Sequence, residues 1–177
     1  MKQENKTFLT LIVVVVIVGG AMFLLSSKQN QKPPQVSLNS QAKIEVPVKF
    51  IDLGNMKVSD EKSADFEIKN IGSQPLELYR VFTSCDCTAA KVITGKQESP
   101  EFNMEMHNSA EASRWTGAVL PGATATIRVI YRPFVMPVFG PIERSVMFST
   151  NDAGNQQVES GFHGRARGRV PAEQVHW

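Results

Sequence analysis

Residues 63–88 read SADFEIKNIGSQPLELYRVFTSCDCT, and this stretch decides the fold. Apolar and polar residues alternate from Phe66 to Lys69, which is typical of a strand with one buried face. The same alternation returns at Leu76 and Leu78, after a segment rich in turn-forming residues. The stretch therefore predicts two strands of a sheet joined by a tight connection.

The rest of the chain repeats this pattern of short strands and turn signals. Ten prolines and twelve glycines in 177 residues favour many turns over long helices. We expect an all-β, two-sheet sandwich of about seven strands. The predicted strands lie near residues 43–52, 63–70, 76–83, 88–93, 124–132, 142–150 and 156–168.

The N-terminal part has a different composition. Residues 8–25, FLTLIVVVVIVGGAMFLL, carry no charge and as a helix approach the roughly 30 Å of a hydrocarbon core. A cleaved signal peptide is the alternative, but its apolar core is usually shorter, about 7 to 15 residues, and no small-residue cleavage pattern follows. We expect an uncleaved transmembrane helix. A seven-residue head before it favours a cytoplasmic N-terminus and an extracytoplasmic C-terminal domain, although the flanking lysines do not decide the topology.

The predicted organisation has five parts. Polar residues and two prolines follow the anchor, so this segment is expected to act as a semi-extended tether. The parts are an N-terminal head at 1–7, the transmembrane helix at 8–25, the tether at 26–42, the sandwich at 43–170 with a long insert at 95–119, and a tail at 171–177.

The order of punctuating residues resembles the bacterial domain-of-unknown-function family 1573, an immunoglobulin-like module related to the ASH and MSP domains. This resemblance implies an immunoglobulin-like sandwich in an exported or envelope protein, and it supplies no catalytic residues. The sequence departs from the family pattern at Leu53, where an aromatic is usual, at Asp86, where Gly is common, and in the insert. The residues that carry the resemblance are Asp52-Leu53-Gly54, Phe66 with Asn70 and Gly72, Pro75-Leu76, Ser84-Cys85-Asp86-Cys87-Thr88, Pro121-Gly122 and Thr150-Asn151-Asp152.

Cys85 and Cys87 are the only cysteines of the chain. On a straight strand their Cα atoms would lie about 6.6 Å apart with both side chains on one face, so a disulfide between them requires a turn at Asp86. Four interpretations stay open: two buried packing thiols, a local disulfide that is easily reduced, pairing with another chain, and metal binding.

The insert offers the nearest further metal ligands. Met104, Met106 and His107, with Cys85 and Cys87, form a soft donor set that would suit copper as Cu(I). The competing interpretation is a hydrophobic clamp that holds the insert on the sandwich, with Trp115 as a second anchor.

Two surface features are candidates for binding. Phe134, Val135 and Phe139 lie in the proline-rich stretch 132–141, which must be a loop and is the best candidate for a partner-binding surface. The alternative is that its aromatic rings fold back and close one end of the sandwich. Arg165, Arg167 and Arg169 alternate along the last strand, either as a charged edge strand or as a ladder facing an anionic surface.

Composition and motifs argue against two functional classes. Lys and Arg total 19 against 17 Asp and Glu, which is too close to neutral for a nucleic-acid binder. The common hydrolase, zinc-protease and phosphate-loop motifs are absent, so we do not expect an enzyme. The expected function is a noncatalytic, membrane-anchored binding or structural module of the cell envelope, acting on an envelope protein or wall component and needing no cofactor. The alternative is a copper-binding or thiol-redox protein.

Overall fold

The computed structural model describes residues 13–17 and 36–168, in two compact units that comprise Met1–Gln35 and Val36–Trp177. In the first unit, residues 13–17 are helical with exposed side chains. The remainder of the predicted transmembrane helix, the head, the tether up to residue 35 and residues 169–177 lie outside the described residues. Within the described ranges, no helix is both long and apolar enough to cross a bilayer.

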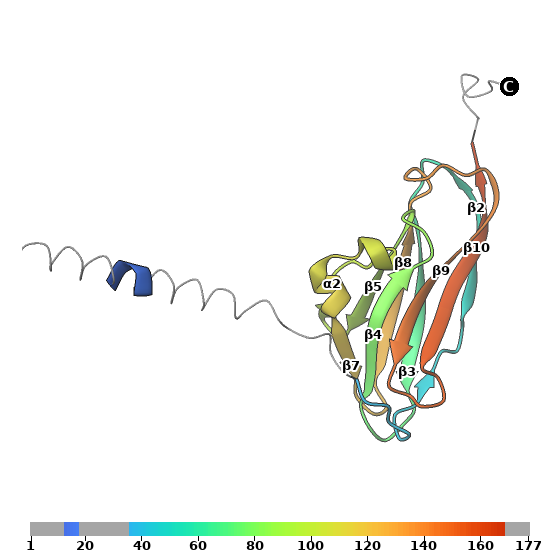
Figure 1. Ribbon diagram of the computed structural model, residues 1–177. Helices are drawn as coiled ribbons and strands as arrows, with labels where there is room; N and C mark the ends of the chain where they lie inside the picture. The colour runs from blue at the N-terminus through green and yellow to red at the C-terminus, as the bar shows by residue number, and fades with distance from the viewer. Residues whose placement is uncertain (1–12, 18–35, 169–177) are drawn as a thin grey trace, which may run out of the picture. The chain divides into compact units, whose positions relative to one another are not determined.

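The described part of the second unit contains ten strands in two five-stranded sheets that face each other (Figure 1). The first sheet has the order β1-β3-β8-β5-β6, and the second has the order β2-β10-β9-β4-β7. In the first sheet the strands are β1 (Ile44–Glu45), β3 (Lys62–Asn70), β8 (Thr124–Tyr131), β5 (Thr88–Thr94) and β6 (Gln97–Glu98). In the second they are β2 (Phe50–Lys57), β10 (Gln157–Arg167), β9 (Gly140–Thr150), β4 (Leu76–Thr83) and β7 (Thr116–Val119).

The predicted all-β, two-sheet sandwich is confirmed, with more strands than the seven expected. One difference lies in the first predicted strand, 43–52, which is two strands: β1 pairs with β3, whereas β2 pairs with β10 in the other sheet. Pro47 lies between them and has no N–H to continue a ladder, so the chain changes sheets there.

The insert at 95–119 accounts for the other additional strands. It contains β6, a short 3-10 helix η1 (Glu105–His107), a single-turn helix α2 (Ala110–Arg114) and β7. β7 extends the second sheet by pairing antiparallel with β4. The insert is therefore part of the sandwich edge and is not an unstructured loop (Figure 1).

Large apolar side chains from both sheets fill the space between them. Phe66 and Tyr131 come from the first sheet, and Phe148 and Phe162 come from the second; all four are almost fully buried. The rings of Tyr131 and Phe162 are 5.3 Å apart across the interior. Burial of this apolar area is the main term that stabilises the fold.

The charged-edge interpretation of the arginines required the last strand to lie at a sheet edge, but β10 does not lie there. β10 lies between β9, with which it pairs antiparallel, and β2, with which it pairs parallel. That interpretation is wrong because β2 covers the edge that β10 would otherwise expose. Arg165 and Arg167 are exposed on the outer face of this sheet, and Arg169 lies outside the described residues.

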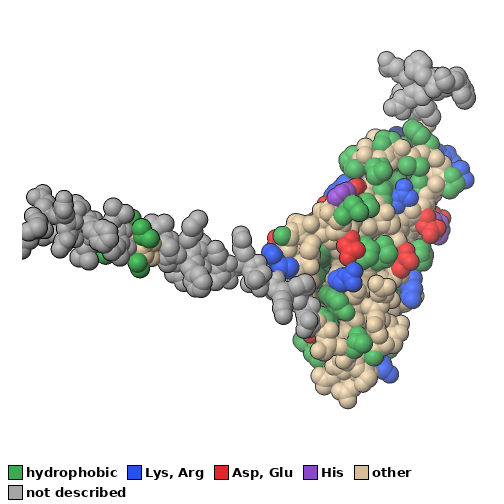
Figure 2. All heavy atoms as spheres, in the orientation of Figure 1, with side chains coloured by type: hydrophobic (Ala, Val, Ile, Leu, Met, Phe, Trp, Pro, Cys, Tyr) green, Lys and Arg blue, Asp and Glu red, His purple; other side chains and the backbone are tan. Residues whose placement is uncertain are grey.

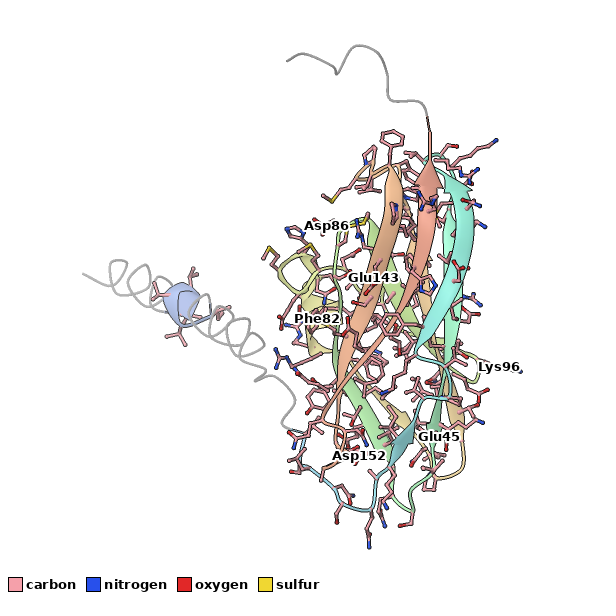
Figure 3. All side chains as sticks on the ribbon, turned by 90° about the vertical axis from the view of Figure 1, so that its right-hand side faces the viewer. Glu45, Phe82, Asp86, Lys96, Glu143 and Asp152 are labelled. Carbon is pink, nitrogen blue, oxygen red and sulfur yellow. A yellow bond between two sulfur atoms is a disulfide. The ribbon has the colours of Figure 1, made fainter. Side chains whose placement is uncertain are left out.

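The sandwich has two distinct ends, which we call the entry pole and the cysteine pole. At the entry pole the incoming chain pairs with the turn that joins β9 to β10, through a hydrogen bond from Asn39 N to Asn151 O. The cysteine pole carries the connection 84–87 between β4 and β5 and the loop 132–139 between β8 and β9. Eleven residues of β9 join the poles, a span of about 36 Å at roughly 3.3 Å per residue. Figure 3 shows Asp86 at one end and Asp152 and Glu45 at the other.

Candidate functional site

The two cysteines lie at the corner where the chain crosses from the second sheet into the first. Residues 84–87 form a turn between β4 and β5, and the N–H of Thr88 donates to the carbonyl of Cys85 at 2.9 Å. The buried hydroxyl of Thr83 contacts the carbonyl oxygens of Cys85 and Thr88, at 3.1 and 2.8 Å. These bonds hold the corner in a fixed conformation.

Cys85 and Cys87 form a disulfide, with their Cα atoms 5.2 Å apart. The expectation that such a bond requires a turn at Asp86 is confirmed, because the turn brings the Cα atoms closer than a straight strand allows. Of the four interpretations of the pair, the structure contains the local disulfide. Cys87 is fully buried, whereas Cys85 keeps 9% of its surface exposed.

Each sulfur of the disulfide receives a hydrogen bond. The backbone N–H of Cys87 donates to Sγ of Cys85 at 3.1 Å, and Nε of Arg144 donates to Sγ of Cys87 at 3.2 Å. The thioether sulfur of Met136, from the loop 132–139, lies 3.8 Å from Sγ of Cys85. Since Met136 is half-exposed, its side chain forms the outer cover of that sulfur.

Arg144 reaches this site from β9, in the opposite sheet to β5. Its Nη1 donates to the carbonyl of Glu143 at 2.6 Å, and no carboxylate among the residues of known position forms a salt bridge with it. The side chain is half-buried. A partly buried guanidinium beside a sulfur provides an electropositive environment for that sulfur.

Tyr131 is a second unusual polar group near this end of the core. Its hydroxyl is buried and has no hydrogen-bond partner among the atoms described. Burial raises the pKa of the Tyr131 phenol, although the positive charge of Arg144 acts in the opposite direction.

The insert packs against the cysteine turn. His107 Nδ1 lies 2.7 Å from a carboxylate oxygen of Asp86, and the side-chain amide of Asn108 donates to the carbonyl of Val81 at 2.9 Å. Phe102 is fully buried, and its ring meets that of Trp115 edge-on at 5.3 Å. Phe102 and Trp115 thus form apolar anchors of the kind expected of a hydrophobic clamp.

The five candidate copper ligands are not brought together as free donors. Cys85 and Cys87 are joined as a disulfide, one ring nitrogen of His107 faces Asp86, and Met106 is 78% exposed. Met104 is half-buried at the start of η1, so the extended alternation that would align the two thioethers is not present. Across the described residues, no three His, Cys, Asp or Glu side chains form a metal-binding group. Copper binding stays a prediction.

The proline-rich loop presents a contiguous apolar surface, which we call the docking surface. Its base is held by Arg132, whose guanidinium bonds to Glu101 at 3.0 Å and to Glu61 at 2.9 Å. The hydrogen bonds with Glu101 and then Glu61 raise the pKa of Arg132. The N–H of Arg132 also donates to the carbonyl of Cys87 at 2.7 Å, which ties the loop to the cysteine turn. The docking surface consists of the exposed side chains Phe134, Val135, Met136, Val138 and Phe139.

The predicted partner residues are all in this surface. Phe134 is 50% exposed and Phe139 is 39% exposed, so neither ring is withdrawn into the core. Figure 2 shows hydrophobic side chains gathered at the end of the sandwich opposite the entry pole. The prolines at 133 and 137 exclude a regular strand from the loop.

Two contributors to this site were not identified from the sequence. Met136 approaches Cys85 across 51 positions of sequence, a proximity that no local pattern indicates. The sequence does give an indication for Arg144, because it occupies an inward-facing position in the alternation of Ile142, Val146 and Phe148. A single charged residue at a strand position that otherwise holds apolar, inward-facing side chains predicts either a buried partner or a functional contact.

Comparison with known proteins supports the fold and the family. Residues 44–106 match the model of DUF1573, a family of proteins of unknown function, so the predicted resemblance to this family is confirmed over this part of the chain. The match begins at β1, ends within η1 and includes the disulfide. No curated protein matches the chain.

Solved structures of similar fold are distant in sequence. A protein of unknown function from Porphyromonas gingivalis W83 aligns with 19% identity and a TM-score of 0.52, over 72% of this chain and 49% of the other. The ASH/PapD-like domain 7 of human CEP192 aligns with 10% identity and a TM-score of 0.47, over 80% of this chain and 97% of that one. The chain thus spans about half of the Porphyromonas protein, and this likeness concerns the fold alone.

Proposed function

We propose that this protein is a noncatalytic binding module of the bacterial cell envelope, which uses the docking surface to bind an extended apolar segment of another envelope protein. The observation that carries the proposal is the docking surface itself, five large apolar side chains exposed together on one loop. Contiguous apolar surface of this kind marks a binding site more often than scattered apolar residues do.

The attachment of the loop supports a binding role. Arg132 holds its base through Glu101 and Glu61, so the apolar side chains are presented from a fixed support. A surface that is already ordered loses less conformational entropy when a partner binds. The partner would bury the two phenylalanine rings as its main anchors.

In this proposal residues 8–25 anchor the chain in the cell membrane as a single-pass helix, with the N-terminus cytoplasmic and the sandwich extracytoplasmic. The uncharged stretch is long enough to span a bilayer, and the polar residues after it act as a tether. The chain enters the sandwich at the entry pole, the end opposite the docking surface.

Site-specific photocrosslinking in the producing bacterium tests the docking surface. A photoreactive residue at position 138 is expected to give one discrete adduct, which is lost in the double variant Phe134→Ser, Phe139→Ser. The matched control is Ile71→Ser with Leu120→Ser, which removes two exposed apolar side chains at the entry pole. Equal loss of the adduct in both double variants, or equal adducts from positions 120 and 138, would contradict a specific docking surface.

Protease accessibility tests the topology independently. Protease added outside spheroplasts is expected to degrade the sandwich and to leave a short membrane-bound fragment. Protection of the sandwich until the membrane is permeabilised would contradict the extracytoplasmic location.

A further inference from the structure

The position of Arg144 requires an explanation beyond packing. A charged group that leaves bulk water is destabilising unless a partner compensates it. Here the side-chain partner is Sγ of Cys87, and within the described residues no carboxylate pairs with the guanidinium. A disulfide sulfur is a weak, neutral acceptor, whereas a thiolate in its place would be a strong one. The guanidinium therefore suits the reduced state of Cys87 better than the oxidised state.

The disulfide contributes little to the stability of the fold. It joins residues two positions apart, so it constrains the unfolded chain far less than a bond that closes a long loop. The corner is also held without it, through Thr83 and the Thr88 to Cys85 hydrogen bond. Reduction can therefore proceed with the sandwich folded.

We propose that the Cys85–Cys87 disulfide is a thiol–disulfide exchange site that accepts electrons from a dithiol of a protein bound at the docking surface. Cys85 is the sulfur that is attacked, and Cys87 is the leaving thiolate. This inference rests on the proposed function, because the docking surface would bring the partner's thiol to Cys85.

The order of attack follows from exposure and charge. Of the two cysteines, Cys85 is partly accessible to solvent, whereas Cys87 is fully buried. The half-exposed side chain of Met136 covers Sγ of Cys85 at 3.8 Å, and an unbranched thioether on a surface loop can rotate aside. Departure of Cys87 as a thiolate is favoured by Nε of Arg144, because a leaving thiol of low pKa departs faster.

The exchange balances in two steps. A thiolate of the partner attacks Sγ of Cys85, a bond forms between the two sulfurs, the Cys85–Cys87 bond breaks, and its electron pair leaves on Cys87. The partner's second thiol, after losing its proton, then attacks the partner's first sulfur and releases Cys85. The partner's dithiol is oxidised to a disulfide, Cys85 and Cys87 are reduced, and the two protons of the partner dithiol are transferred to them or to solvent. One domain transfers one disulfide, so the process is stoichiometric.

The first test is reduction of the full-length chain in detergent micelles by dithiothreitol, without denaturant, followed by alkylation and mass measurement. We expect both cysteines to become alkylated while the sandwich keeps its circular dichroism spectrum. If the disulfide opens only at denaturant concentrations that unfold the sandwich, it is structural and the proposal is overturned.

A second test isolates the role of Arg144. In the Cys85→Ser variant, which leaves Cys87 as a single thiol, thiolate absorbance against pH reports the pKa of Cys87. We expect Arg144→Gln to raise that pKa by about one unit or more, Arg144→Lys to restore part of the shift, and the control Arg165→Gln to leave it unchanged. An unchanged pKa in Arg144→Gln would overturn the assignment of Cys87 as the stabilised thiolate.

A third test separates exchange from docking. Two synthetic dithiol peptides are compared as reductants, one with Leu and Phe flanking its cysteines and one with Ser at those positions. We expect the apolar peptide to react faster, and its advantage to disappear in the variant Phe134→Ser, Phe139→Ser. Equal rates would overturn delivery by the docking surface while exchange still stands, and reduction by neither peptide would overturn the exchange site itself.

Discussion

The carboxylate of Asp152 accepts a hydrogen bond from the backbone N–H of Ile44, 108 positions earlier in the sequence, at 3.1 Å. The same carboxylate accepts hydrogen bonds from Gly154 N at 2.8 Å and from the side-chain amide of Asn155 at 2.9 Å. Asp152 is buried at the entry pole. It therefore joins the first strand of the sandwich to its last turn.

Replacement of this carboxylate should destabilise the domain. In Asp152→Asn, an amide group faces donors on at least one side, so we expect a loss of about 1.5 to 3 kcal/mol in the free energy of unfolding. Asp52→Asn is the matched control, because Asp52 makes the same local bond to the N–H of Gly54, at 2.7 Å, but is exposed. Chemical denaturation of both variants measures the difference. Equal stability of the two would mean that the long-range bond to Ile44 contributes nothing.

Asp152 also predicts that the stability of the domain falls at acidic pH. Burial raises the pKa of Asp152, but the hydrogen bonds from Asn155, Ile44 and Gly154 outweigh it, so the pKa is lowered overall. A lowered folded-state pKa means that the stabilisation is complete above the unfolded value near 3.9 and is lost as the pH falls through the folded value. We expect the wild type to lose stability below about pH 4 more steeply than Asp152→Asn. Parallel acid-unfolding curves would contradict this.

Gly72 lies at the same pole, at a position where the backbone leaves no room for a side chain. A Cβ at this position would overlap the carbonyl oxygen of Gln41 and lie 2.6 Å from the backbone nitrogen of Lys43. Backbone atoms cannot move aside as a flexible side chain does, so Gly72→Ala should cost about 1 to 3 kcal/mol in unfolding free energy. Ser73→Ala, at the next position, is the control. If Gly72→Ala matches the wild type in thermal unfolding, Gln41 and Lys43 do not pack there.

The extent to which this structure follows from the sequence differs between local and long-range features. The alternation around Phe66 and Ile68 predicts a strand because every second side chain reaches the core. The change of sheet at Pro47 is not evident from the sequence, since the alternation of Ile44, Val46 and Val48 runs across it and only the pairing partners separate the two strands. β6 was missed because two residues are too few to show a period.

In the candidate site, too, local features follow from the sequence, whereas contacts between distant residues do not. The spacing of Cys85 and Cys87 left the disulfide open, because the bond depends on a turn that Asp86 permits but does not require. The proline-rich loop was predicted as a partner-binding candidate from composition alone, and its apolar side chains are exposed. The contacts of Met136 and Arg144 with the sulfurs arise from the fold and link residues 51 and 57 positions apart.

Two side chains of the insert, Phe102 and Met106, are expected to differ strongly in their contribution to stability. Phe102 is fully buried against Trp115, so Phe102→Ala should cost about 3 to 5 kcal/mol in unfolding free energy. Met106 is largely exposed, and Met106→Ala should change stability by about 0.5 kcal/mol or less. Thermal or urea unfolding of both variants provides the measurement. A similar cost for the two would contradict the clamp as the device that holds the insert.

Copper binding provides the last prediction, because it depends on the state of the two cysteines. Cu(I) prefers thiolate and thioether ligands, and a disulfide supplies no thiolate. The oxidised full-length chain should therefore leave a Cu(I)-chelator complex unchanged in a competition titration. After reduction, any one-to-one uptake should be lost in Cys85→Ser with Cys87→Ser, whereas Met106→Ala alone should have a smaller effect because Met106 points into solvent in this structure. Tight uptake by the oxidised chain would instead assign copper to Met104, Met106 and His107 without the sulfurs of the turn, and retention of Cu(I) by the reduced double variant would exclude a thiolate site.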